Sequence, residues 1–156
     1  MKYFTISEFI KSDTAIKKKI WNGASRDVED NIIALVAVVL DPLREKYGKP
    51  IRVSSGYRCK EVNKAAGGAV TSQHLNGEAA DICVDAGVRG NLEVGKLIVK
   101  TGNFDQIIFE NVGKNDMLPQ WIHVSWKRKG ENRGEIRKKV KGDDGYPVIT
   151  RKELGL

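Results

Sequence analysis

The clearest hydrophobic pattern in the chain lies in its first third and has helical spacing. Ser25 is placed to cap a helix, and Tyr47-Gly48 is placed to end it. Pro42 lacks an amide proton, so we expect it to kink this helix or to interrupt its hydrogen bonding. Between these ends, apolar residues recur every three or four positions, as on one helix face, at Val28, Ile32, Leu35, Val36, Val39 and Leu43.

After Pro50 the pattern changes to short apolar runs separated by turns. A helix is predicted over 58–66, where Gly67-Gly68 would end it, and another over 92–100 with Asn91 as its cap. The polar stretch 111–120 predicts a surface loop. Helices and strands are partly segregated, which indicates an α+β fold with a small antiparallel sheet and flanking helices. Strands are predicted where β-branched and aromatic residues cluster, over 51–54, 79–84, 104–109 and 121–126.

Length and composition indicate one ordinary globular domain. The chain has 156 residues, of which 40 % are hydrophobic and 30 % are charged, and no repeat or linker marks a boundary. The longest apolar run, Ile32–Leu40, has nine residues, about half of the roughly 18 that span a bilayer. We therefore expect no membrane span. We also expect a monomer. Cys59 and Cys83 are expected to be buried, reduced thiols, with a disulfide or a metal role as alternatives.

The positive charge of the chain is concentrated at its C-terminal end. The net charge is +7, and residues 127–156 contain ten Lys and Arg against five Asp and Glu, whereas the first 126 residues have seventeen against fifteen. Such a segment attracts polyanions, including anionic cell-wall polymers, or forms a solvated tail. No recognition-helix pattern or aromatic-basic interleaving indicates specific nucleic-acid binding.

Both histidines of the chain lie in positions suited to a shared metal. His74 is in a predicted loop, and Asp81 follows it on a predicted strand after small residues that permit a tight turn. His123 lies in the middle of the aromatic strand 121–126. Two imidazoles and one carboxylate are the ligand set of a catalytic zinc, which keeps a fourth position for water. Spacing alone leaves open that His123 has only a structural role.

These residues form a longer motif that resembles a known family. The run Ser72-x-His74-x-x-Gly77-x-Ala79-x-Asp81 is preceded by Ser55-Gly56-Tyr57-Arg58, Asn63 and Gly67-Gly68, and is followed by Trp121-Ile122-His123-Val124. This pattern resembles the zinc D-alanyl-D-alanine carboxypeptidase family, whose fold is shared with the hedgehog signalling domain and which includes phage endolysins. The resemblance covers residues 4–126, leaving 127–156 as a basic extension of the same domain.

The resemblance implies one zinc per chain, held by His74, Asp81 and His123. It also implies that Arg58 lies in the active site and binds a substrate carbonyl or carboxylate, where a planar donor fork suits developing negative charge. The alternative for Arg58 is a local ion pair. Ser72 matches the serine of the motif and is expected either to bond the substrate or to make a local turn bond.

One position departs from the family pattern. Better-known members carry an acidic residue three positions before the last histidine, as general base for the attacking water, whereas this chain has Gln120. Glu110 is the best substitute. If the two aromatic strands form a hairpin with Glu110 opposite Trp121, then Ile108 faces His123 and Glu110 lies one diagonal away on the same face. A one-residue slip would reverse that face.

Three residues near this hairpin have competing interpretations. Trp121 shares the face of His123 and would either wall the substrate groove or simply pack. Asp105 and Glu78 are weaker candidates for the base, and we expect them to be solvated or structural. The remaining alternative for Glu110 itself is an exposed glutamate at a strand end.

Together these features predict a zinc metallopeptidase that hydrolyses D-alanine-containing peptides of bacterial peptidoglycan, as a carboxypeptidase or an endopeptidase. The first residues lack an apolar segment, so we expect synthesis in the cytoplasm without a signal peptide. Action on the cell wall would then follow release by phage lysis or from a virion. Two alternatives belong to other classes: a catalytically inactive zinc-containing module that binds wall or partner, and a polyanion binder using 127–141.

Overall fold

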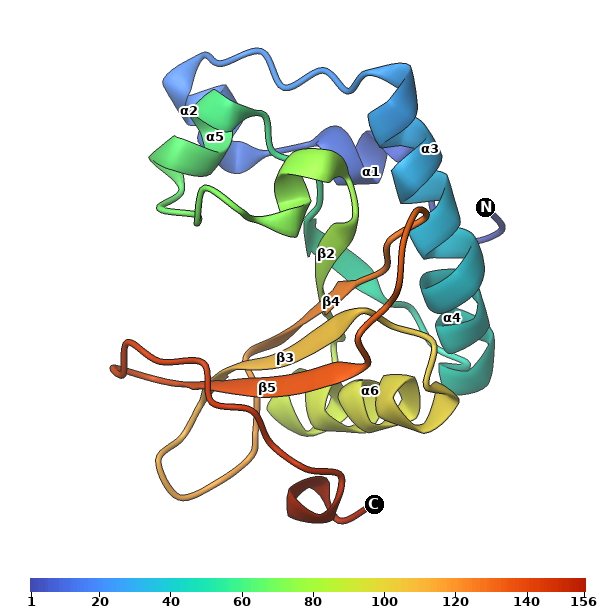
Figure 1. Cartoon of the computed structure of the whole chain (residues 1–156), viewed down its shortest axis with the longest axis vertical. Helices are drawn as coiled ribbons and strands as arrows, with labels where there is room; N and C mark the ends of the chain where they lie inside the picture. Colours follow the sequence, from blue (N-terminus) through green and yellow to red (C-terminus); the bar gives the residue numbers. More distant parts are fainter.

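A five-stranded sheet forms the centre of the molecule in the computed structural model, which describes residues 1–156 (Figure 1). The strand order is β1-β2-β4-β3-β5, and only the β3–β5 pair is parallel. The predicted α+β class is therefore confirmed, with a fifth strand that the sequence did not indicate. The strands are β1 (Arg52–Ser55), β2 (Ala79–Cys83), β3 (Gln106–Val112), β4 (Trp121–Ser125) and β5 (Glu135–Val140).

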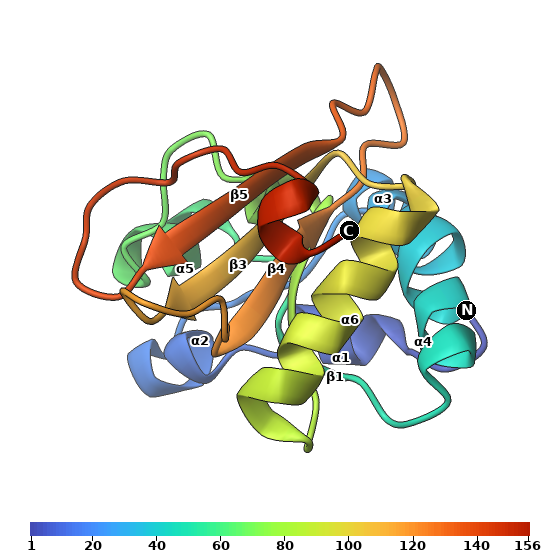
Figure 2. The same ribbon diagram turned by 90° about the horizontal axis from the view of Figure 1, so that it is seen from below.

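Helices lie on both sides of this sheet. Figure 1 shows α1, α2 and α5 above the sheet, α6 below it, and α3 and α4 as one column along its side. Figure 2 shows α6 beside β4, running in roughly the same direction as the strands. None of the helices combines the length and the apolar character that a membrane span needs. The α-helices are α1 (Ile6–Ile10), α2 (Asp13–Lys18), α3 (Arg26–Leu35), α4 (Asp41–Tyr47), α5 (Lys60–Ala65) and α6 (Gly87–Thr101). A π-helical turn (Val36–Leu40) and two 3-10 turns (Gln73–Asn76 and Lys152–Leu154) complete the set.

The sheet has one apolar and one polar face, because side chains alternate along each strand. The apolar face packs against α6, which contacts β2, β3 and β4. Gly95 permits this close approach, since a Cβ there would lie 2.5 Å from the Phe109 ring. The opposite face carries Asp81, His123 and Glu110. The apolar face consists of Ala80, Ile82, Ile107, Phe109, Ile122, Val124 and Ile136.

The long helical column confirms the expectation for Pro42. Ser25 caps α3, with its Oγ accepting a bond from the Val28 amide at 3.5 Å, and Gly48 ends α4 at a φ of 74°. Between them the chain widens into a π-helical turn in which the Asp41 amide donates to the Val36 carbonyl, one residue further back than in an α-helix. The turn absorbs the interruption by Pro42 without ending the column.

The prediction that Asn91 caps a helix is wrong. Helix α6 begins four residues earlier, at Gly87, so Asn91 lies inside it and is buried. Its side chain accepts a hydrogen bond from the Val84 amide at 2.9 Å and donates to the Gln120 carbonyl at 2.7 Å. Asn91 therefore ties the end of β2 to the start of β4. The cysteines are free, as expected, but half-buried rather than buried.

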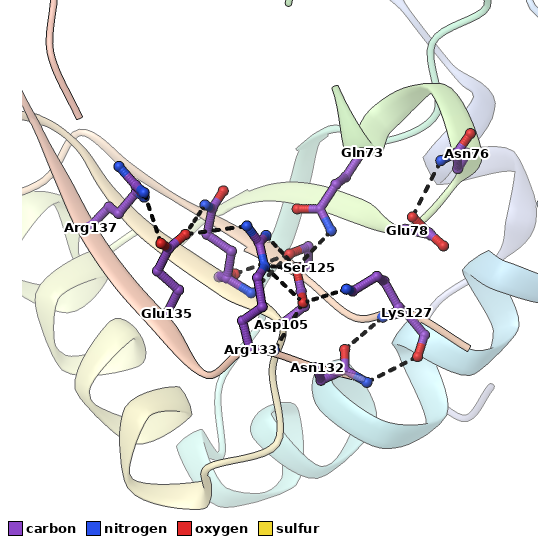
Figure 3. A network of polar contacts seen from close by, with 11 residues as sticks. Gln73, Asn76, Glu78, Asp105, Ser125, Lys127, Asn132, Arg133, Glu135 and Arg137 are labelled. Carbon is purple, nitrogen blue, oxygen red and sulfur yellow. Dashed lines mark hydrogen bonds and ion pairs between the residues drawn. The ribbon is translucent and has the colours of Figure 1, made fainter. Parts of the chain in front are cut away.

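A buried carboxylate joins three segments that are distant in sequence (Figure 3). Asp105 has no exposed surface. It accepts a bond from Gln73 Nε2 at 2.9 Å, pairs with Lys127 Nζ at 3.1 Å and with Arg133 Nη2 at 2.5 Å. Burial alone would raise the pKa of Asp105, but the bonds from Arg133 and Lys127 hold it well below its usual range. Asp105 is therefore structural and not solvated.

We predict that Asp105→Asn lowers the free energy of unfolding by about 3 kcal/mol at pH 7, because two cations lose their buried partner. A carboxyl whose folded pKa is depressed stabilises the protein above its unfolded pKa, near 4, and loses that effect as pH falls. The difference between wild type and variant should therefore shrink below about pH 4. Urea denaturation at pH 7 and pH 3 measures it.

Asp143→Asn is the matched control, since this exposed residue carries the same charge change and should alter the stability by less than about 0.5 kcal/mol. Equal losses in the two variants would contradict a special role for Asp105.

Candidate metal centre

Strand pairing brings the two candidate ligands of the sheet side by side. Asp81 on β2 lies directly opposite His123 on β4. Residues that face each other on antiparallel strands project to the same side, and His123 Nδ1 lies 3.1 Å from Asp81 Oδ1. His74 approaches from the 3-10 turn above the sheet, with its Nε2 3.2 Å from His123 Nδ1 and 3.3 Å from Asp81 Oδ1.

A backbone contact fixes the orientation of the His74 ring. His74 Nδ1 lies 2.7 Å from the Gly56 carbonyl, which can only accept, so Nδ1 carries the proton and Nε2 faces the other two residues. Such outer contacts set the tautomer of ligating histidines. Gly56 is required here because a Cβ would lie 2.5 Å from the carbonyl oxygen of Phe9. This close passage explains the glycine of the Ser-Gly-Tyr-Arg segment.

Arg58 holds the other side of Asp81. Its Nη2 donates to Asp81 Oδ2 at 2.9 Å, and its Nε donates to Ser55 Oγ at 3.0 Å. Asp81 Oδ1 is thereby left for the two imidazoles. The ion pair is not the local one considered from the sequence, because 23 positions separate its partners. Arg58 also lines the groove in front of the centre, so its guanidinium lies at the expected site.

The three side chains together have the chemistry of a metal site. His74 and His123 are buried, at 3 % and 9 % exposure, and the ligand atoms of the three residues lie within 4.8 Å of one another. Burial alone would raise the pKa of Asp81, but the two imidazoles hold it well below its usual range, so the carboxylate is anionic. Two nitrogens and one oxygen suit zinc and leave one position open.

Glu110 lies beside this centre with its carboxylate unbonded. The register is Glu110 opposite Trp121 and Ile108 opposite His123, as the hairpin hypothesis required. Glu110 is buried at 9 % exposure, lines the same groove and makes no side-chain hydrogen bond within the chain. Burial raises the pKa of its carboxyl, the His123 imidazole opposes this, and the Asp81 charge adds to it.

A groove of about 580 Å³ opens in front of the centre. Ser72 and Trp121, both half-buried, lie along it. The Ser72 hydroxyl makes no hydrogen bond in the chain, so the local turn bond considered from the sequence is not formed. Residues that the sequence did not indicate complete the wall, namely Gln106, Arg133, Arg137 and Tyr146. Arg137 lies in the segment 135–140, which carries only two apolar residues and therefore gave no clear strand signal.

Two residues considered in the search for the general base, Gln120 and Glu78, lie away from the groove. Gln120 is exposed. Its backbone N–H donates to the backbone carbonyl of Glu110 at 2.8 Å, so Gln120 belongs to the connection between β3 and β4. Glu78 accepts a bond from Asn76 Nδ2 at 3.4 Å on the far side of the His74 turn (Figure 3). Neither residue lines the groove.

Comparison with known proteins gives one family. A search of curated proteins finds no match. The family model described as Peptidase M15 matches residues 2–125, more than three quarters of the chain. The matched range includes His74, Asp81, His123, Arg58 and Glu110, and it ends before β5. The metallopeptidase class expected from the His-Asp-His motif is therefore confirmed at the level of the family: the chain belongs to the peptidase M15 family.

Proposed function

We propose that the protein is a zinc-dependent peptidase that hydrolyses D-alanine-containing peptide bonds of bacterial peptidoglycan. The observation that carries this proposal is the buried His74-Asp81-His123 group with the unbonded carboxylate of Glu110 beside it in one groove. Hydrolysis of a peptide by a metalloenzyme needs ligands that hold the metal and a neighbouring base that accepts the proton of the attacking water. The choice of D-alanine peptides comes from the resemblance of the motif.

The residues divide into those that hold the metal and those that act on substrate. His74, Asp81 and His123 would hold one zinc ion, which when bound supplies Lewis-acid chemistry and lowers the pKa of water. The Gly56 carbonyl and Arg58 keep His74 and Asp81 in their ligating orientation.

Glu110 serves as general base in this proposal. Its carboxylate accepts a proton from the attacking water and delivers it to the leaving amine. Burial raises its pKa above the ordinary value of a glutamate, which makes its carboxylate a better proton acceptor. Arg58 has N–H groups beyond those bonded to Asp81 and Ser55, and these can bind the oxygen of the scissile carbonyl as negative charge develops there. Trp121 and Ser72 line the path of the peptide.

Action on the cell wall fits a phage or prophage enzyme that is released by lysis or carried on a virion, and we extend the proposal to that setting. A carboxypeptidase releases a terminal D-alanine, whereas an endopeptidase cuts within stems or cross-links. Mass spectrometry of purified peptidoglycan digested with the protein separates the two by the fragments produced.

We predict that cleavage of peptidoglycan stops when a chelator removes the metal and returns when zinc is added back. Fragment masses and metal content are measured on the same samples. If a protein that holds one zinc cleaves nothing, the zinc-containing binding module replaces the enzyme.

We predict that Asp81→Asn lowers the zinc content from about one per chain to below about 0.1, because a neutral amide replaces the anionic ligand and loses its pair with Arg58. Inductively coupled plasma mass spectrometry of the dialysed protein measures this. Asp85→Asn, the same change at an exposed position four residues away, should leave one zinc bound. Full zinc content in Asp81→Asn would contradict the ligand assignment.

We predict that Glu110→Gln lowers turnover by about 10²- to 10⁴-fold, the usual contribution of a general base, with zinc content unchanged. Release of fragments from peptidoglycan is the readout. In the Glu110→Gln background, Gln120→Glu should not restore activity, because residue 120 lies outside the groove. Recovery in that double variant would place the base at the usual family position, and full activity of Glu110→Gln would refute its role.

A further inference from the structure

The row of paired residues that contains the metal centre continues to the edge of the sheet. Asp81 faces His123, His123 faces Ile108, and Ile108 faces Arg137 on β5. Paired residues on adjacent strands project to the same side. Arg137 therefore projects from the site face, two strands beyond His123, and it lines the same groove. With strands about 4.8 Å apart, the two positions are separated by about 10 Å.

The surrounding residues hold the Arg137 guanidinium in place. It donates to Glu135 Oε1 at 2.8 Å and to the Tyr146 carbonyl at 2.5 Å. Glu135 is itself fixed by Gln106 Nε2 at 2.6 Å (Figure 3). Hydrogen bonding from Arg137 lowers the pKa of Glu135 to about 2, so this support remains charged. Arg137 Nε is buried without a partner, so its donors are not all satisfied within the chain.

Positive charge exceeds negative charge at this end of the groove. Three cations (Lys127, Arg133 and Arg137) pair with two carboxylates (Asp105 and Glu135). Lys139 Nζ lies 4.7 Å from the centre of the Tyr146 ring, which also lines the groove. Lys139 also lies near Glu110, because its charge lowers the pKa of that carboxyl. An anionic group on a bound peptide is therefore favoured near Arg137 and disfavoured near Glu110.

We propose that Arg137, whose guanidinium is held by Glu135 and the Tyr146 carbonyl, forms a substrate subsite for a free carboxylate of the peptide, about two or three residues from the cleaved bond. A planar guanidinium is suited to bidentate binding of a carboxylate. An extended peptide advances about 3.3–3.6 Å per residue, so about 10 Å corresponds to two or three residues. The subsite rests on the proposed peptidase function, but it lies in the segment beyond the family match.

The test compares three peptides on the zinc-loaded protein carrying Glu110→Gln, so that binding is measured without turnover. The parent is L-alanyl-γ-D-glutamyl-L-lysyl-D-alanyl-D-alanine. In one analogue the glutamyl α-carboxylate is amidated, and in the other the C-terminal carboxylate is amidated. Calorimetry should show about ten- to hundredfold weaker binding of the glutamyl amide than of the parent, as for loss of a charged hydrogen-bonded pair.

Arg137→Gln should abolish the preference for the free glutamyl carboxylate and leave the effect of the C-terminal amide unchanged. Arg137→Lys should retain part of the preference, because it keeps the charge without the planar fork. Lys138→Gln is the matched control, since Lys138 has the opposite parity on β5, shared with the core residue Ile136, and it should keep the full preference. Thermal unfolding of each variant shows that the folds are comparable.

The subsite is overturned if Arg137→Gln keeps the preference, if Lys138→Gln loses it equally, or if the parent peptide does not bind. Cleavage by the protein with native Glu110 is followed separately on the parent peptide. Cleavage with no dependence on Arg137 would refute the subsite and support the peptidase, whereas Arg137-dependent binding without cleavage would do the reverse.

Discussion

The register of the sheet is the constraint on which the rest of the site depends. Because side chains alternate along a strand, a shift of one residue in any pair would move its polar residues to the core face. The pairing of Asp81 with His123 and of His123 with Ile108 places Asp81, His123 and Glu110 on one face. The same register places the apolar residues against α6, so one strand register fixes both the core packing and the site geometry.

Three carboxylates of the chain, Asp81, Asp105 and Glu110, are largely removed from water, and this raises the free energy of their charged forms unless they are paired. A charged carboxylate away from water must be paired, because desolvation otherwise favours its neutral form. Asp81 is paired by Arg58 and by two imidazoles, and Asp105 by Arg133 and Lys127. Glu110 has no such partner, so its pKa rises. The contrast separates two carboxylates that neighbouring side chains pair from one that has no such partner.

The C-terminal segment contributes residues to the wall of the groove. Arg133 reaches the carboxylate that also holds Gln73, the neighbour of His74. In this way the last strand is connected to the turn that carries a candidate ligand. The basic charge seen in the sequence is therefore partly directed into the groove and partly compensated by Asp105 and Glu135, and it is not simply a solvated tail.

The α+β class and the helical column with its interruption at Pro42 could be predicted from local patterns, because periodicity and turn residues act within a few positions. The grouping of His74, Asp81 and His123 came from the resemblance of the longer motif, since spacing alone left the role of His123 open. The folded structure was needed to place Gln120 outside the groove and Glu110 inside it, because strand register is a non-local property. The existence of β5 also depends on the fold. Residues 135–140 carry only two apolar side chains and become a strand through parallel pairing with β3. Long-range pairing of this kind produces little local hydrophobic pattern. For that reason the sequence did not predict that Arg137 and Tyr146 line the groove.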